Sequence, residues 1–485
     1  MSKAIMFQGT GSDVGKSVLV AGFCRALKHR GLTVRPFKPQ NMSNNAAVTA
    51  DGGEIGRAQA LQALACGIEP SVHMNPVLLK PQSNRNAQII VQGKVRGTTD
   101  ANWFRHHKSD LMVHIINSFN SLKQEADIVV VEGAGSPAEV NLRAGDIANM
   151  GFALATSTPV ILIGDIDRGG VIASLVGTHM LLEKEEQNLV RGFIINKFRG
   201  DISLFDEGLT TISDHTEWPS CGVLPFVPAV KRLPAEDAVT LGRPDKAHSR
   251  KIVIAVPMLS RIANFDDVDP LKLEEDIDLR FIPPGTPLPA EARLILIPGT
   301  KATSADMAFF RAQGWDIDLA AHVRQGGYVL GICGGFQMLG KTVSDPEGIE
   351  GIPGIHDGLG HLDITTIMQT TKTVRQITAY SPLLDCSARG YEIHAGETTG
   401  PQMNQPFLTC DGRPVGAMSE NGQIMGSYLH GLFTDDNFRA HFLSLLRSGN
   451  VVQSNFSQQI EDAIDILADQ MEKHLDIDFL LQTAV

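Results

Sequence analysis

The sequence lacks the features of secreted and membrane-embedded chains. Its 485 residues contain no apolar stretch long enough to span a bilayer. The N-terminus carries no charged segment followed by an apolar one, as a signal peptide would. The six cysteines are scattered without a Cys-x-x-Cys pair, which argues against a disulfide framework or a zinc ribbon. We therefore expect a soluble protein in a reducing cytoplasm.

An excess of basic charge is also missing. Lys and Arg number 42 against 54 Asp and Glu, which leaves a formal net charge of −12. This surplus of acid argues against nucleic acid or an anionic membrane as the main partner, but it leaves room for a local basic pocket. The chain is too long for one core, so its length predicts two or three domains.

Short apolar runs alternate with helical patterns from residue 1 to about 230. Such alternation predicts βαβ units and a parallel sheet covered on both faces, that is, an α/β domain whose ligands bind at the carboxyl ends of the strands. The expected strands are Ala4–Gln8, Thr33–Lys38, Asp127–Val131, Pro159–Gly164 and Arg191–Asn196. The expected helices are Lys16–His29, Glu54–Ala65, Ile147–Ala155 and Val171–Leu182.

A glycine-rich turn follows the first expected strand and leads into a helix. It reads Gly9-Thr10-Gly11-Ser12-Asp13-Val14-Gly15-Lys16-Ser17. Backbone N–H groups and a lysine at a helix start are suited to binding phosphate. The standard P-loop spacing has glycine at the position of Thr10, so with Gly9 as first glycine the loop is one residue longer. A glycine turn with a surface lysine is the alternative, and the strand–loop–helix context favours phosphate binding.

Acidic and polar residues follow other strands at the same edge of the predicted sheet. Glu132 ends the strand 127–131, where a carboxylate beside a P-loop can hold Mg²⁺; a solvated surface acid is the alternative. Three further segments are either turns and helix caps or substrate-binding segments. The substrate candidates in them are Asn41, Asp146, Asp165, Asp167 and Arg168.

A segment with several prolines and few helix or strand patterns separates this half from a second α/β pattern. We predict a first domain at 1–230, a linker at 231–250, a second domain at 251–445 and a helical tail at 446–485. Apolar residues of the tail recur at helical spacing, which predicts an amphipathic helix packed on the body or on another subunit of a homo-oligomer. They are Ile460, Ala463, Ile464, Leu467, Ala468 and Met471.

A cysteine between glycines is the most distinctive feature of the second half. Cys333 follows the apolar run 328–332 and is flanked by Gly331, Gly334 and Gly335. This pattern is typical of a nucleophile elbow, in which a helix N-terminus stabilises a thiolate and an oxyanion. His430 follows another expected strand and is a candidate general base, with a structural or surface histidine as the alternative.

The first half resembles the dethiobiotin synthetase-like group of P-loop enzymes, and its glycine-rich loop 9–17 carries the resemblance. The resemblance implies that ATP phosphorylates a carboxylate to an acyl phosphate, which an amine then attacks. The residues that it assigns to ATP are Gly9, Thr10, Asp13, Gly15, Lys16, Ser17, Lys38 and Asn196. Those that it assigns to Mg²⁺ are Ser17, Glu132 and Glu54, the last at a position where the group has Asp.

The second half resembles the class I (triad) glutamine amidotransferases. The residues that carry the resemblance are Gly331-Ile332-Cys333-Gly334-Gly335-Phe336-Gln337 and His430. It implies a Cys333 nucleophile, a His430 base, oxyanion-hole N–H groups from Gly299 and Gly334, and Gln337 in the glutamine pocket. That family has Glu two residues after its histidine, where this chain has Leu432. Either Cys333 and His430 act as a dyad, or another group orients the imidazole.

Both halves together resemble the cobyric acid synthase family over nearly the whole chain. The motifs that carry this resemblance lie at 37–44, 165–170 and 390–394. It implies that the b, d, e and g carboxylates of adenosylcobyrinic acid a,c-diamide are amidated with ammonia from glutamine. The residues alone support an ATP-dependent ligase fed with ammonia. The alternatives are the sister enzyme that makes cobyrinic acid a,c-diamide and a P-loop ATPase switch or scaffold with an inert amidase-like domain.

Overall fold

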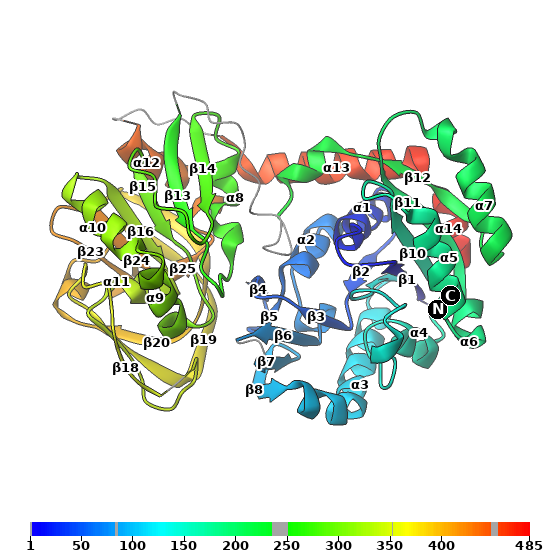
Figure 1. Cartoon of the computed structure of the whole chain (residues 1–485), viewed down its shortest axis with the longest axis horizontal. Coiled ribbons are helices and arrows are strands. Elements are labelled where there is room, and N and C mark those ends of the chain that lie inside the picture. The colour runs from blue at the N-terminus through cyan, green and yellow to red at the C-terminus, as the bar shows by residue number, and fades with distance from the viewer. Residues whose placement is uncertain (1, 83–85, 235–250, 352, 448–453) are drawn as a thin grey trace.

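The computed structural model describes residues 2–82, 86–234, 251–351, 353–447 and 454–485. The chain forms two α/β domains that lie side by side (Figure 1), and the predicted fold class is confirmed. Across these ranges, no helix combines the length and the apolar character needed to cross a membrane. The predicted linker at 231–250 falls mostly on residues 235–250, which lie outside the described residues.

The first domain is built on a parallel sheet with the strand order β12-β11-β10-β1-β9-β2. Its strands are β1 (Lys3–Gly9), β2 (Val34–Phe37), β9 (Ile128–Glu132), β10 (Val160–Asp165), β11 (Val190–Phe198) and β12 (Ser220–Pro225). Strands β1, β9 and β10 are apolar and buried almost throughout, as expected where helices cover both faces. The helices are α1 (Lys16–His29), α2 (Arg57–Cys66), α3 (Ala101–Gln124), α4 (Met150–Thr156), α5 (Val171–Leu181), α6 (Lys184–Leu189) and α7 (Asp206–Thr216).

Between β2 and α3 the chain forms small sheets that the sequence analysis did not predict. A four-stranded sheet contains β3 (Gln40–Met42), β6 (Val77–Pro81), β7 (Asn86–Val91) and β8 (Lys94–Asp100), and an antiparallel pair contains β4 (Ala46–Val48) and β5 (Glu54–Gly56). The predicted helix start at Glu54 was wrong, because Glu54 pairs with Val48 in this ladder and α2 begins at Arg57.

The second domain has its own sheet, with the strand order β14-β13-β15-β16-β24-β23 and only the last pair antiparallel. Its strands are β13 (Ile252–Pro257), β14 (Ile277–Ile282), β15 (Leu294–Ile297), β16 (Tyr328–Ile332), β23 (Gly416–Met418) and β24 (Ile424–Ser427). The helices of this domain are α8 (Asp269–Lys272), α9 (Thr303–Ala312), α10 (Trp315–Arg324), α11 (Gly334–Leu339) and α12 (Asp436–Leu446), with a 3-10 helix η6 (Phe265–Val268).

A largely antiparallel sheet completes the second domain and faces the first. It contains β17 (Thr342–Asp345), β18 (Gly354–Asp357), β19 (Thr365–Ser381), β20 (Cys386–Thr399), β21 (Thr409–Cys410), β22 (Arg413–Pro414) and β25 (Leu429–His430). Strand β19 is unusually long, and its pairing with β20 shifts register between Met368 and Thr373. Figure 1 shows β19, β20 and β25 on the side of this domain that faces β4.

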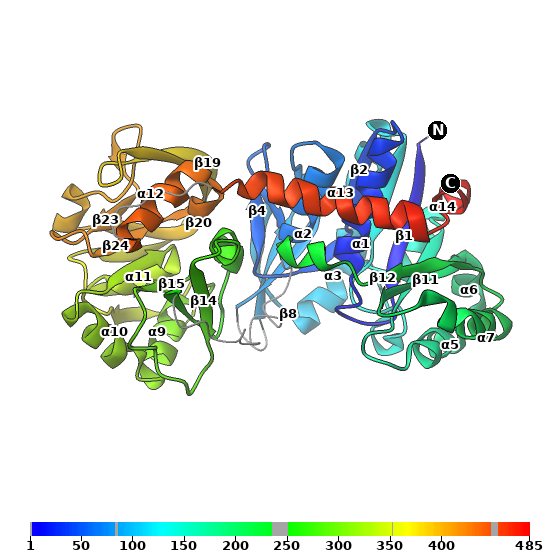
Figure 2. The same cartoon turned by 90° about the horizontal axis from the view of Figure 1, so that it is seen from above.

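The predicted C-terminal helix returns to the first domain. Helix α13 (Phe456–His474) lies along α1, and α14 (Ile477–Thr483) follows it (Figure 2). All six apolar residues that predicted this helix are buried. Arg25 of α1 pairs with Asp465 at 2.9 Å, which adds a charged contact to the apolar one. The amphipathic face therefore packs on the body of the same chain.

Backbone and apolar contacts join the two domains. Ala46 and Val48 of β4 form one buried cluster with Tyr391 and Ile393 of β20. The hydroxyl of Tyr391 donates to the carbonyl oxygen of Ala46 at 3.3 Å, and the N–H of Ala46 donates to Asn264 Oδ1 at 3.2 Å. The second domain therefore packs against the strand pair β4–β5 of the first domain.

Buried ion pairs reinforce this interface. Glu54 Oε2 accepts from Lys80 Nζ at 2.9 Å, and its Oε1 accepts from Lys372 of the second domain. Although burial opposes ionisation, the two lysines hold the pKa of Glu54 well below its usual range. Burial in turn lowers the pKa of Lys372 to about 7. A second pair joins Arg57 to Asp266 at 3.0 Å.

Replacing Glu54 should destabilise the docked arrangement. Glu54→Gln leaves two buried ammonium groups without a counter-charge, and breaking a buried pair in this way costs about 3–5 kcal/mol. The free energy of unfolding from urea titration measures this loss. Glu291→Gln is the control, because it removes the exposed partner of Arg280 and should cost no more than about 1 kcal/mol. Equal losses in the two variants would contradict the role of Glu54.

Candidate active sites

Cys333 lies at a strained strand-to-helix turn. It joins β16 to α11 with φ 53° and ψ −109°, a left-handed backbone that a residue with a side chain rarely adopts. The neighbouring glycines allow the turn: a Cβ on Gly335 would lie 2.1 Å from the carbonyl oxygen of Ile297, and one on Gly331 would lie 2.6 Å from that of Gly335. The predicted elbow is therefore present, with its thiol at a helix start.

His430 lies beside this thiol and is held by a carboxylate. Its Nδ1 lies 2.7 Å from Asp267 Oδ2, and the N–H of Gly431 donates to Asp267 Oδ1 at 2.7 Å. Burial opposes a charged imidazole, but Asp267 and Cys333 raise the pKa of His430 to about 10. The ring is therefore protonated at neutral pH and can form an ion pair with a thiolate.

Asp267 is the orienting group that the sequence analysis left open. It comes from η6, 163 residues before His430, and it takes the place that the acid two residues after the histidine holds in other triad enzymes. The one available signal is the acidic run 266–269, which follows the carboxyl end of β13. Cys333, His430 and Asp267 therefore form a triad.

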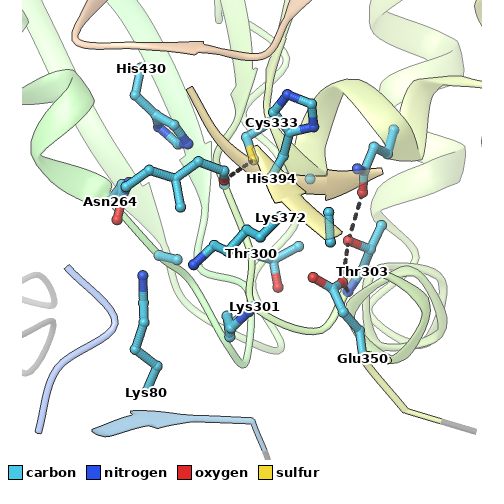
Figure 3. Close-up of a pocket in the computed structure, with 16 residues that line it drawn as sticks. Lys80, Asn264, Thr300, Lys301, Thr303, Cys333, Glu350, Lys372, His394 and His430 are labelled. Atoms are coloured by element: carbon cyan, nitrogen blue, oxygen red, sulfur yellow. Dashed lines mark hydrogen bonds between the residues drawn. The ribbon is translucent and has the colours of Figure 1, made fainter. Parts of the chain in front are cut away.

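A pocket opens in front of Cys333 (Figure 3). Gly299, Gly334, Gln337 and His430 line it together with the thiol. A Cβ on Gly299 would lie 3.2 Å from His430 Cε1, so the backbone at Gly299 lies close to the imidazole. The structure brings the predicted oxyanion and glutamine residues to one pocket; their roles stay predictions.

A second constellation surrounds the P-loop of the first domain. Lys16 Nζ donates to the carbonyl oxygens of Gly11 and Gly135 at 2.9 and 3.0 Å. Ser17 Oγ lies 2.6 Å from Glu132 Oε1, and Lys38 Nζ lies 2.8 Å from the same oxygen. Four of the predicted residues, from three different strand ends, therefore meet at one edge of the sheet.

The donors at this edge suit Mg²⁺. A hydroxyl and a carboxylate are hard oxygen ligands, and Mg²⁺ takes one or two such groups together with phosphate oxygens and water. Within the described residues, no group of three or more His, Cys, Asp or Glu side chains could hold a metal ion. Ser17 and Glu132 fit that arrangement.

Glu54 requires a correction. It was predicted as a further metal ligand, but both of its carboxylate oxygens are bound by the ammonium groups of Lys80 and Lys372 at the domain interface. The physical reason is the β4–β5 ladder, which turns Glu54 toward the second domain. Besides Ser17 and Lys38, Glu132 is contacted from α2, where Gln62 Nε2 donates to its Oε2 at 2.6 Å.

The remaining nucleotide candidates support the loop. The N–H of Thr10 donates to the carbonyl oxygen of Ile163 at 3.0 Å, and Asn196 Nδ2 donates to that of Val14 at 2.8 Å. Asp13 and Gly15 both have positive φ, and a Cβ on Gly9 would lie 2.5 Å from Val14 Cγ2. These residues shape the turn that the phosphates would enter.

Three of the substrate candidates lie in ion pairs at the same edge. Asp165 pairs with Lys197 at 2.7 Å, Asp167 with Arg199 at 2.6 Å, and Arg168 with Asp13 at 3.2 Å. Asp167, Arg168 and Arg199 are partly exposed. An anionic substrate could therefore reach the guanidinium groups of Arg168 and Arg199. Their assignment to substrate stays a prediction.

The other two substrate candidates have local partners. Asn41 Nδ2 donates to Gln59 Oε1 at 3.1 Å, on the helix that also contacts Glu132. Asp146 accepts the backbone N–H groups of Ala148 at 2.8 Å and Gly151 at 2.9 Å, at the start of α4. Its carboxylate thus caps a helix N-terminus, the alternative that its sequence position had left open, and its assignment to substrate stays a prediction.

Comparisons with known proteins agree with this division into two sites. Residues 5–241 match a CobQ/CobB/MinD/ParA nucleotide binding domain, and residues 253–438 match a CobB/CobQ-like glutamine amidotransferase domain. The chain is 59% identical to a cobyric acid synthase of Brucella suis over 100% of both chains. It is also 59% identical to that of Brucella anthropi over 99% of both chains, and 58% identical to that of Brucella abortus over 100%.

Among solved structures, PurLQS from Thermotoga maritima is similar at a TM-score of 0.30 and 15% identity, over 44% of this chain and 97% of that chain. A glutamine amidotransferase is similar at a TM-score of 0.32 and 18% identity, over 40% of this chain and 98% of that chain. TM-scores this low carry no argument about either site.

Asp267 should control the protonation of His430. In Asp267→Asn the charge that stabilises the imidazolium is lost, so the pKa of His430 falls from about 10 and the high-pH limb of glutamine hydrolysis moves to lower pH. We expect kcat to fall about 10²- to 10⁴-fold, the usual contribution of a positioned acid–base group. The measurement is the pH profile of ammonia release.

Asp363→Asn is the control for this variant, because Asp363 is half exposed and pairs with Lys341 outside the pocket. It should keep the pH profile of the unmodified protein. An unchanged high-pH limb in Asp267→Asn would contradict the triad.

Proposed function

Because the chain belongs to the cobyric acid synthase family, we propose that its domains perform two linked steps of one amidation. The protein is an ATP-dependent, glutamine-hydrolysing amide ligase of cobalamin biosynthesis. In the proposed division of labour, the second domain releases ammonia from glutamine and the first activates a substrate carboxylate. The observation that carries the proposal is the Cys333–His430–Asp267 triad, whose pocket is also lined by Lys80 of the ATP domain.

Release of ammonia begins with the Cys333 thiolate. Its sulfur bonds to the side-chain amide carbon of glutamine, and the N–H groups of Gly299 and Gly334 stabilise the oxyanion that forms. The C–N bond then breaks as His430 gives its proton to the leaving nitrogen. Water, activated by the now neutral His430, hydrolyses the thioester to glutamate and restores the thiol. Asp267 holds the ring in place throughout.

The P-loop domain prepares the acceptor. Lys16 and Lys38 stabilise the charge of the ATP phosphates while a substrate carboxylate oxygen bonds to the γ-phosphorus and ADP leaves. Ser17 and Glu132 would hold Mg²⁺, which supplies neutralisation of phosphate charge when bound. Ammonia then attacks the acyl phosphate carbon and phosphate departs, which leaves the amide. Arg168 and Arg199 are placed to attract the carboxylates of a polyanionic substrate.

We assign adenosylcobyrinic acid a,c-diamide as the substrate, amidated at its b, d, e and g carboxylates. The assignment is supported by the identity of 59% to cobyric acid synthases over the full length of both chains. The sister activity on the a and c carboxylates is the competing assignment, since similar domains would serve it.

The substrate assignment predicts which corrin acid gains amides. We expect the purified protein, with ATP and glutamine, to add four amides to adenosylcobyrinic acid a,c-diamide, counted by mass spectrometry. Cobyrinic acid itself should gain no amides at its a and c positions. The reverse pattern would assign the sister reaction, and the absence of any glutamine-dependent amidation would support a scaffold with an inert amidase-like domain.

The use of two sites predicts that ammonium bypasses the first step. Cys333→Ala removes the nucleophile, so glutamine-dependent amidation should be lost, while amidation with added ammonium salt continues through the P-loop domain. Cys410→Ala is the matched control, because Cys410 is a free cysteine of the same domain that does not line the pocket. Loss of both activities in a folded Cys333→Ala variant would contradict separate sites.

A further inference from the structure

Two side chains of opposite charge line the pocket of Cys333 without forming an ion pair with each other. Lys301 and Glu350 both line it, and among the described residues they form no ion pair with one another (Figure 3). The side chain of Lys301 is also without a hydrogen-bond partner in those parts of the chain, although Lys301 is only 8% exposed. Burial lowers the pKa of Lys301, whereas the charge of Glu350 raises it, so an anionic ligand in the pocket would stabilise the ammonium form.

Glu350 offers one carboxylate oxygen to the same pocket. Its Oε2 accepts the backbone N–H of Thr303 at 3.1 Å and the Thr303 hydroxyl at 3.0 Å, which fixes the side chain at the start of α9. Its Oε1 has no hydrogen-bond partner within the described residues. Glu350 is therefore held rigidly by one oxygen while the other stays available.

The other cations of the pocket already have partners. Lys80 and Lys372 both bind Glu54. The ring of His394 stacks on Tyr428 with the centroids 3.7 Å apart, and its Nδ1 lies 2.8 Å from the carbonyl oxygen of Gly396. Of the lysines that line the described pocket, Lys301 is thus the one left to a ligand.

We propose that Lys301 binds the α-carboxylate of glutamine and that Glu350 Oε1 binds its α-ammonium group. The inference rests on the proposed glutaminase step and names the groups that select its substrate. A free amino acid is a zwitterion, and in glutamine two methylene groups separate the charged end from the amide. A pocket with a thiol, an ammonium and a carboxylate on its wall matches that molecule. An amide within a protein chain has neither charge and is rejected.

The alternative is that both residues only support the fold. Glu350 caps α9, and the N–H of Lys301 donates to the carbonyl oxygen of Arg261 at 3.0 Å. A structural role would lower the hydrolysis of every amide equally. A recognition role would lower only the hydrolysis of amides that carry the matching charge.

Three amides separate these roles. L-Glutamine carries both charges, 4-aminobutanamide lacks the α-carboxylate, and glutaramate lacks the α-ammonium group. In Lys301→Met, we expect kcat/KM to fall about 10- to 100-fold for glutamine and glutaramate relative to 4-aminobutanamide, the range expected for a hydrogen bond to a charged group. In Glu350→Gln, it should fall for glutamine and 4-aminobutanamide relative to glutaramate. Both losses should lie mainly in KM, because these contacts to the non-reacting end of glutamine are the same in the bound substrate and in the transition state.

Lys341→Met is the matched control, since Lys341 is more than half exposed and pairs with Asp363 outside the pocket. It should keep the relative kcat/KM values of the three amides. Equal losses for all three amides in Lys301→Met or Glu350→Gln would overturn the assignment for that residue. An unmodified protein that hydrolyses no glutamine would instead overturn the proposed function, so the two failures are distinguishable.

Discussion

The buried carboxylate of Glu54 is the interaction on which the arrangement of both sites depends. It lies between Lys80 of the first domain and Lys372 of the second, so Lys372 loses its counter-charge if the domains separate, while Lys80 keeps Glu54 beside it. Lys80 and Lys372 also line the pocket of Cys333, which means that the wall of the glutaminase site is completed only when the domains are docked. The position of Glu54 in the sequence had suggested a metal ligand. Its carboxylate instead links the two domains that carry the active sites.

Helix α2 extends this dependence to the ATP site. Its first residue, Arg57, pairs with Asp266, whose neighbour Asp267 orients His430. Two and five residues further along the helix, Gln59 and Gln62 contact Glu132 at the P-loop. Residues of the single short helix α2 therefore contact both active sites. Because a helix is rigid, it holds the two sites in a fixed position relative to each other.

The local parts of both sites were predictable from the sequence, because short-range geometry encodes them. A P-loop is a strand, a glycine turn and a helix, and the Cys333 elbow is the same succession with a thiol. Glu132 followed from the rule that parallel strands end at one edge. Asp267, Lys301 and Glu350 could not be recognised in this way, since tertiary packing brings them to Cys333. Glu54 was misplaced because its strand pairing with Val48 overrode the helical pattern around it.

The packing of α13 on α1 makes the second domain an insertion within the first rather than an appendage to it. The second domain follows the 3-10 helix Pro228–Arg232 of the first domain and is itself followed by α13, which packs on α1, so the inserted domain is joined to the first at both of its ends. Two attachments restrict the movement of the inserted domain relative to the first more than a single attachment would.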